Sequence, residues 1–121
     1  MPSADQIRAT VAAYVDAYAR NDREGFVALW APDGVLEDPV GTPAHEGIAA
    51  IGAFWDSARQ LADRILLEPQ NVIVAGDEAA MVFDIHAHIG DTEMVMQAVD
   101  IMRCDDAGRL VSVRAYWEMG G

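Results

Sequence analysis

The C-terminal half of the chain holds four successive segments in which polar and apolar residues alternate, and this run restricts the fold more than any other feature. The segments cover residues 65–76, 78–90, 93–105 and 109–119. Alternation with a period of two is typical of β-strands, and the connections between these segments have the length of hairpin turns. The sequence therefore predicts four consecutive strands, each antiparallel to the next.

The N-terminal half has helical spacing instead. Steps of three and four residues predict a helix over residues 4–20, whose buried stripe carries Ile7, Val11, Tyr14 and Tyr18. Ser3, followed three residues later by Gln6, matches a helix N-cap pair. The other predicted elements are a short helix from residue 23 that ends before Pro32, an extended segment over 35–41, a loop over 42–47 and a third helix over 48–62.

Helices followed by an antiparallel meander predict an α+β domain. With 121 residues, 52% of them hydrophobic, the chain is long enough for one buried core. We expect a single domain over residues 1–121, in which about three N-terminal helices pack on one face of a curved, mainly antiparallel β-sheet.

Charge and composition narrow the classes of partner. The formal net charge is −12, so we expect no nucleic-acid partner, and a small neutral or apolar ligand is easier to accommodate. No apolar run approaches the roughly 20 residues that cross a membrane. The N-terminus lacks a basic segment followed by an apolar stretch, and Cys104 is the single cysteine. The sequence therefore predicts a cytoplasmic protein without disulfides.

Asp100 interrupts an apolar strand face. Residues alternate along a strand, so Asp100 shares its face with Met94, Met96, Ala98, Met102 and Cys104. Tyr14 lies in the buried helical stripe, and Asp38 alternates with Leu36 and Val40. Burial raises the pKa of a carboxyl group by up to roughly 3–5 units, and a neutral Asp100 would donate a hydrogen bond. Tyr14 and Asp100 together could then stabilise an oxyanion, with Asp38 as an ionised base.

Each of these residues also has a structural interpretation. Tyr14 fits a core aromatic, and Asp38 before a proline fits a turn or capping residue. Asp100 could form a buried salt bridge with Arg103 or Arg114, although both arginines alternate to the opposite face. The three residues together favour a functional interpretation more strongly than any one of them does alone.

The motifs that carry these residues resemble those of the Δ5-3-ketosteroid isomerases, within the nuclear-transport-factor-2-like and SnoaL-like superfamily of cone-shaped folds. They are "LEDPVG" (36–41), "AVDIMR" (98–103) followed by "DDAGRL", and "RAYW" (114–117). The resemblance implies that Asp38 shuttles a proton, that Tyr14 is the main oxyanion donor and that Asp100 is a protonated second donor. The implied reaction converts a β,γ-unsaturated 3-ketosteroid to its conjugated isomer without cofactor or metal. It also implies a homodimer through the outer sheet face, where we expect Val82, Val99 and Ile101.

Two departures from the family pattern concern the site. Trp30 and Trp55 stand where family members commonly carry two tyrosines behind the oxyanion tyrosine, and Cys104 stands where a phenylalanine is usual. The expected walls of an apolar, steroid-binding cavity are Phe54, Met81, Phe83, Ala115 and Trp117, with Trp55 flanking it. Burial of apolar ligand surface, at about 25 cal/mol per Å2, would supply most of the binding energy.

Two other functions fit the same residues. One is a polyketide-cyclase-like or dehydratase-like enzyme that uses the same acid–base pair, and the other is a non-catalytic binder of a hydrophobic small molecule. His86 and His88, with Asp84, are expected on the outer sheet face, where spacing without further ligands is weak evidence for a metal. We expect His45 at the surface, and Met94, Met96 and Met102 in the pocket or core.

Overall fold

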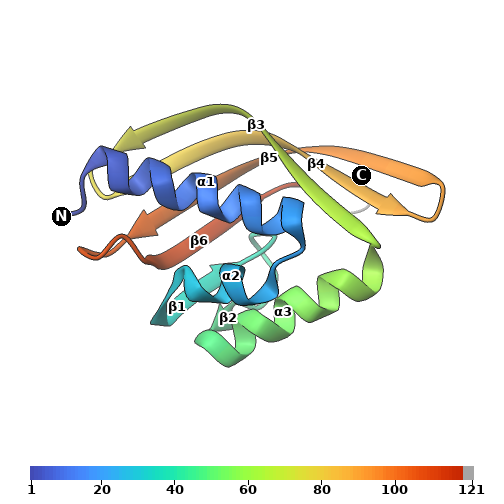
Figure 1. The fold of residues 1–121 in the computed structure, drawn as a ribbon, viewed down its shortest axis with the longest axis horizontal. Coiled ribbons are helices and arrows are strands. Elements are labelled where there is room, and N and C mark those ends of the chain that lie inside the picture. Colours follow the sequence, from blue (N-terminus) through green and yellow to red (C-terminus); the bar gives the residue numbers. More distant parts are fainter. Residues whose placement is uncertain (119–121) are drawn as a thin grey trace.

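The computed structural model describes residues 1–118 and arranges three helices on a six-stranded sheet (Figure 1). The expected strand position of Met119 lies outside the described residues. The helices are α1 (Ala4–Arg20), α2 (Arg23–Ala28) and α3 (Ile48–Leu61). The strands are β1 (Trp30–Glu37), β2 (His45–Glu46), β3 (Arg64–Ala75), β4 (Glu78–Ile89), β5 (Thr92–Cys104) and β6 (Leu110–Tyr116).

The sheet has the order β2-β1-β6-β5-β4-β3. Strands β3 to β6 form the antiparallel meander that the alternating segments predict. Strand β1 adds to β6 in parallel and pairs with β2 antiparallel, so the sheet is mixed but mostly antiparallel. The helices lie together on one side of the sheet (Figure 1), which confirms the α+β class.

The first helix begins and ends where its sequence dictates. The Ser3 side chain accepts a hydrogen bond from the Gln6 N–H, and the Ser3 N–H donates to the Gln6 side chain at 2.8 Å, which completes a capping box. Asn21 ends the helix with a φ of 52°, in the left-handed region that asparagine tolerates. The predicted stripe is buried and includes Tyr14 and Tyr18. Helix α1 therefore brings two phenols into the core.

The segment after α2 differs from the prediction. Pro32, Asp33 and Gly34 were expected to end a helix, but they lie within β1, and residues 45–46 of the expected loop form β2. The register between β1 and β6 shifts between Trp30 and Val35. A bulge accepts a proline because it frees the chain from donating a ladder hydrogen bond there. Local turn propensity was therefore overridden by pairing with a distant strand.

The hairpin between β4 and β5 extends beyond the core (Figure 1). Ile89, Met94 and Val95 near its tip are 46%, 48% and 52% exposed. The expectation that Met94 fills the pocket or core is therefore wrong, although Met102, on the same strand face, is fully buried. Alternation identified the face but not how far along the strand the helices cover it.

No described helix combines the length and the apolar character that crossing a membrane requires.

Candidate active site

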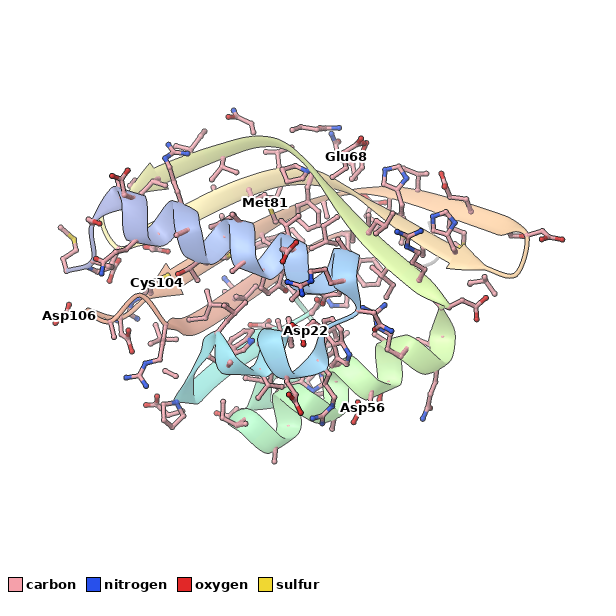
Figure 2. The ribbon with its side chains drawn as sticks, viewed as in Figure 1. Asp22, Asp56, Glu68, Met81, Cys104 and Asp106 are labelled. Atoms are coloured by element: carbon pink, nitrogen blue, oxygen red, sulfur yellow. The ribbon has the colours of Figure 1, made fainter. Side chains whose placement is uncertain are left out.

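The sheet register places the residues of the candidate site in one row. Asp100 on β5 lies opposite Met81 on β4 and Ala115 on β6, and Figure 2 shows Met81 in the middle part of the sheet. The Ala115 carbonyl accepts a hydrogen bond from the Val40 N–H at 2.8 Å, so the segment that carries Asp38 continues the row. Neighbouring strands are about 4.8 Å apart. The backbones of Asp38 and Asp100, distant in sequence, are therefore about two strand spacings apart.

Asp38 directly follows β1 and is partly buried. Burial raises the pKa of its carboxyl group to about 6, and a hydrogen bond from Trp117 opposes this rise. The Trp117 Nε1–H donates to Asp38 Oδ1 at 2.7 Å. A carboxyl group with a pKa of about 6 is largely ionised at neutral pH and remains a usable proton acceptor.

Asp100 has a different environment. It is 2% exposed, and its Oδ1 has no hydrogen-bond partner among the described residues. Burial, and then the charge of Asp38, raise its pKa well above the ordinary value. Its protonated form can donate a hydrogen bond, which the ionised form cannot.

The arginines that were considered as partners for Asp100 bind other carboxylates. Arg103 Nε lies 3.3 Å from Asp77 Oδ2, and Arg114 Nε lies 3.2 Å from Glu37 Oε1. Within residues 1–118 the salt-bridged interpretation of Asp100 is therefore wrong. This agrees with the alternation that put both arginines on the opposite strand face.

Tyr14 faces both carboxyl groups from α1. It is 1% exposed, and its pKa is raised by burial first and then by Tyr18, Asp100 and Asp38. A phenol with a raised pKa keeps its proton and stays a hydrogen-bond donor. The structure thus brings Asp38 close enough to raise the pKa of Asp100, and both carboxyl groups close enough to raise the pKa of Tyr14.

Two further residues at the site were not selected as site residues from the sequence, although Tyr18 belongs to the predicted buried stripe. Tyr18 is 6% exposed, its ring centroid lies 5.5 Å from that of Tyr14, and burial followed by the charges of Asp38 and Asp100 raises its pKa. The Arg59 Cζ lies 5.7 Å from the Tyr18 ring centroid. The spacing of four residues from Tyr14 to Tyr18 could have indicated a second phenol on the same helix face. Arg59 has a similar signal, because it follows Trp55 by four residues on α3.

The two tryptophans at the expected tyrosine positions are buried aromatics. Trp30 and Trp55 are each 3% exposed, and their ring centroids lie 6.0 and 4.7 Å from that of Phe26. The Trp30 indole nitrogen has no hydrogen-bond partner among residues 1–118. The phenol next to Tyr14 is supplied by Tyr18, from α1 itself.

The expected cavity walls occupy different places. Trp117 lines a pocket of about 600 Å3 together with Val40, Met96, Gln97, Tyr116 and Glu118. Met81, Phe83 and Ala115 are buried. Phe54 is partly buried, with its ring centroid 5.1 Å from that of His45 on β2, and His45 itself is partly exposed. Trp117 is part of the pocket wall and also donates a hydrogen bond to Asp38. It therefore connects the pocket to the row that contains Asp38 and Asp100.

The outer sheet face carries a polar cluster. Ligand-type atoms of Glu68, Asp84 and His86 lie within 4.8 Å of one another, and Figure 2 shows Glu68 on β3, far from α3. The His86 ring nitrogens lie 3.2 Å from Glu68 and 3.3 Å from Glu93. Asp84 and His86 alternate with Phe83, so they point away from the carboxyl row. We interpret the cluster as a surface charge network.

Comparisons with known proteins place this geometry in a family. Residues 11–113 match the model of the SnoaL-like domain. The Steroid Delta-isomerase of Nocardioides simplex is 35% identical over 115 residues, which cover 95% of this chain and 92% of that protein.

Two solved structures are similar over nearly the whole chain. The epoxide hydrolase/cyclase-like enzyme SalBIII, described in pyran ring formation in the polyether salinomycin, aligns with a TM-score of 0.88 and 25% identity over 98% of this chain and 95% of that chain. Rv0760c from Mycobacterium tuberculosis, in complex with estradiol-17β-hemisuccinate, aligns with a TM-score of 0.84 and 27% identity over 94% of this chain and 95% of that one. The family model covers most of the sequence and the relatives share its α+β architecture, so the chain belongs to the SnoaL-like (nuclear-transport-factor-2-like) domain family.

Proposed function

We propose that the protein is a steroid delta-isomerase that converts a Δ5-3-ketosteroid to the conjugated Δ4-3-ketosteroid. One observation carries the proposal: two carboxyl groups in one row have separated proton affinities. Asp38 has a pKa of about 6, whereas the pKa of Asp100 is raised well above its ordinary value. A base and a neutral donor thus coexist near neutral pH, beside Tyr14. The likeness to the Nocardioides simplex enzyme supports the same reaction.

The proposed reaction moves one proton within the substrate. Ionised Asp38 removes a proton from C4, and the electron pair of that C–H bond enters a dienolate whose negative charge is centred on the C3 oxygen. The Tyr14 hydroxyl and the protonated Asp100 donate hydrogen bonds to that oxygen. Asp38 then returns the proton to C6, which leaves the double bond between C4 and C5. No proton or electron is consumed, so the chemistry requires no cofactor.

Trp117 would steady the base during this transfer. Its indole N–H donates to one carboxylate oxygen of Asp38 at 2.7 Å, which leaves the other oxygen to accept the proton. The bond also favours the ionised form of Asp38 against the effect of burial. A carboxylate held in this position can take the proton from C4 and return it to C6 without water acting as an intermediate base.

A turnover assay tests the proposal. The conjugated product of 5-androstene-3,17-dione absorbs in the ultraviolet, so the wild type should produce a steady rise in absorbance. Asp38→Asn should lower the rate by about 10²-fold or more, the usual effect of losing a general base. Asp33→Asn, the same change at an exposed position of β1, is the matched control and should retain turnover. No absorbance rise with the wild type contradicts the isomerase, and an Asp38→Asn variant at the wild-type rate contradicts the base.

A cyclase-type reaction is the second candidate. Asp100 Oδ1 has no partner among residues 1–118, so its proton could be donated to an epoxide oxygen while Asp38 deprotonates an attacking hydroxyl. The similarity to SalBIII supports this alternative. Incubation with a hydroxy-epoxide tests it, because ring closure gives a product of unchanged mass that chromatography separates from the substrate.

A non-catalytic binder is the third candidate. The similarity to Rv0760c, whose structure contains a steroid derivative, supports a small hydrophobic ligand on this fold. Titration with estradiol, followed by tryptophan fluorescence, measures binding directly. Binding of steroids without turnover of either substrate class would favour this function over the two enzymatic ones.

We further propose a homodimer through the outer sheet face. Val82, Val99 and Tyr116 lie opposite one another across β4, β5 and β6, and Tyr116 is 42% exposed. An apolar row of this kind fits a self-complementary interface. Sedimentation equilibrium should give twice the chain mass for the wild type and a smaller species for Val99→Glu. A monomeric wild type would contradict the dimer.

The cytoplasmic location is also a proposal. Its support is that Cys104 is a buried free thiol, which suits a reducing compartment. Fractionation of cells that express the full chain would test it, and recovery outside the cytoplasm would contradict it.

A further inference from the structure

The guanidinium of Arg59 is buried without a hydrogen-bond acceptor. Its Nε, Nη1 and Nη2 atoms are all shielded from solvent, and none has a partner among residues 1–118. Burial correspondingly lowers its pKa from the ordinary value. A buried cation without an acceptor destabilises the folded protein unless a partner offsets the loss of hydration. The proposed reaction gives this group no role.

Aromatic rings surround this cation but leave its donors unmatched. The Arg59 Cζ lies 4.3 Å from the centroid of Trp55 and 5.7 Å from that of Tyr18. Ring faces attract a cation, but a guanidinium also needs oxygen acceptors in its plane for its N–H groups. Stacking fixes the position of the guanidinium and leaves its hydrogen-bonding capacity unused.

The lack of a carboxylate beside Arg59 contrasts with most arginines of the chain. Among the described residues, Arg8 and Arg64 also have no ion pair, but both are exposed. There are 20 acidic residues and only 8 basic ones. Five other arginines pair with acidic side chains: Arg20, Arg23, Arg103, Arg109 and Arg114. In a chain with such an excess of carboxylates, an arginine that is buried beyond their reach is available to an anion from outside.

Arg59 also lies close to the proposed reaction site. Tyr18 neighbours both groups: its ring centroid lies 5.5 Å from that of Tyr14 and 5.7 Å from the Arg59 Cζ. A ligand whose ketone oxygen lies at Tyr14 and Asp100 reaches the guanidinium if its long axis runs along Tyr18. Planar bidentate pairing with a carboxylate is the interaction that guanidinium geometry favours most.

We infer that Arg59 is a specificity-determining residue that binds a carboxylate at the end of the apolar ligand away from its ketone. The natural ligand class is then a rigid polycyclic keto acid. This inference rests on the ligand class proposed above, but it does not depend on the isomerase reaction, because binding alone reveals it. A carboxylate at Arg59 would supply the missing acceptors and offset the cost of burying the charge.

A matched pair of ligands tests the inference. Both 3-oxo-4-androstene-17β-carboxylic acid and its carboxamide carry the same ring system, and only the acid is charged at neutral pH. Titration followed by tryptophan fluorescence or calorimetry should show that the wild type binds the acid at least about tenfold more tightly than the amide. Arg59→Met should abolish that preference while still binding the amide.

The controls separate charge recognition from general effects. Arg64→Met removes one positive charge at the exposed start of β3 and should keep the preference. Arg59→Lys should retain part of it, because an ammonium pairs with a carboxylate without the bidentate geometry. If Arg59→Met does not fold, Arg59→Gln makes the same comparison with a polar, uncharged side chain.

The outcomes distinguish this inference from the proposed function. Equal affinity of the wild type for acid and amide, or equal loss of both in Arg59→Met, overturns the carboxylate site. The second result would assign Arg59 to packing against Trp55 and Tyr18. Failure of both ligands to bind the wild type overturns the polycyclic ligand class and this inference with it. A preference for the acid in a protein that does not isomerise ketosteroids supports this inference and contradicts the isomerase.

Discussion

Asp38 and Asp100 are the same chemical group in two environments. Asp38 is partly buried and receives a hydrogen bond from Trp117, and its pKa is about 6. Asp100 is almost fully buried without a partner for Oδ1 in the described chain. Burial disfavours the charged form of both, but only Asp38 has a donor that favours ionisation. In the proposed reaction, this difference suits one carboxyl group to act as the base and the other as the hydrogen-bond donor.

Loss of either oxyanion donor should slow the proposed reaction. Tyr14→Phe and Asp100→Leu each remove one hydrogen bond to the dienolate oxygen, and a typical loss is about 2.7–4 kcal/mol of transition-state stabilisation. Steady-state kinetics should show the effect in kcat rather than KM, because the charge develops only during the reaction. Wild-type kinetics in both variants would return these residues to a structural role.

Removal of the indole donor should shift the pH profile. The Trp117 hydrogen bond lowers the pKa of Asp38, so Trp117→Phe should raise it above about 6. Since the base acts only when ionised, the acidic limb of log(kcat/KM) should move to higher pH. Tyr116→Phe, at the adjacent exposed position, is the control and should leave the limb in place. An unshifted limb in Trp117→Phe would show that the indole does not tune Asp38.

At the scale of elements, α1 supplies both phenols of the site from one face. Tyr14 and Tyr18 are one helical turn apart and are buried together. The capping box at Ser3 fixes where the helix begins and satisfies backbone donors there. The placement of the phenols follows from the helical stripe rather than from the cap.

Loss of the cap should therefore affect stability more than activity. Ser3→Ala removes the acceptor for the Gln6 N–H and should lower the free energy of unfolding by about 1 kcal/mol. Urea denaturation measures this loss. Activity of the folded variant should stay unchanged, because Tyr14 lies far from the cap along the helix. A fall in activity without a fall in stability would contradict this division.

Strand β1 has the corresponding role for the base. Its parallel pairing with β6 brings Glu37 opposite Arg114, and the Glu37–Arg114 ion pair at 3.2 Å joins the two strands. Asp38 follows directly and lies beside the row that contains Ala115 and Asp100. The position of the base thus depends on a long-range pairing between residues far apart in the sequence.

At the scale of the whole molecule, the neutral form of Asp100 links function to stability. Its pKa is raised in the folded protein and ordinary in the unfolded chain. Below a pH of about 4 both states bind the proton, so the group does not affect stability. As the pH rises, the unfolded chain releases the proton while the folded protein keeps it. Asp100 therefore lowers stability increasingly towards neutral pH.

Asp100→Asn should remove that destabilisation. The variant should unfold at a higher urea concentration than the wild type at pH 7, because an amide has no proton to lose as the pH rises. The difference should shrink as the pH falls towards 4. Asp33→Asn, at an exposed position of β1, is the control and should show no such trend. A variant that is less stable than the wild type at pH 7 would contradict a neutral, unpartnered Asp100.

Periodicity predicted the fold well because each element satisfies its own local pattern. The capped stripe of α1 and the alternating segments of β3 to β6 have the expected type and nearly the expected bounds. The prediction failed at residues 30–34 and 45–46, which form strands through pairing with β6 and β1, because no local pattern encodes a distant partner. The sequence identified candidate-site residues where a polar group interrupts an apolar face, as at Asp100. It did not identify the hydrogen-bond partners of those groups.

The sequence by itself determined the α+β class, the order of the elements and the three polar groups that face the core, because periodicity and polarity are local properties of the chain. Only the tertiary structure decided which groups meet. It placed the Trp117 donor on Asp38, separated the protonation of two identical acids, and left the guanidinium of Arg59 buried beside Tyr18 without an acceptor among residues 1–118. The physical reason is that desolvation and hydrogen bonding depend on which distant segments pack together, and a local pattern does not specify this.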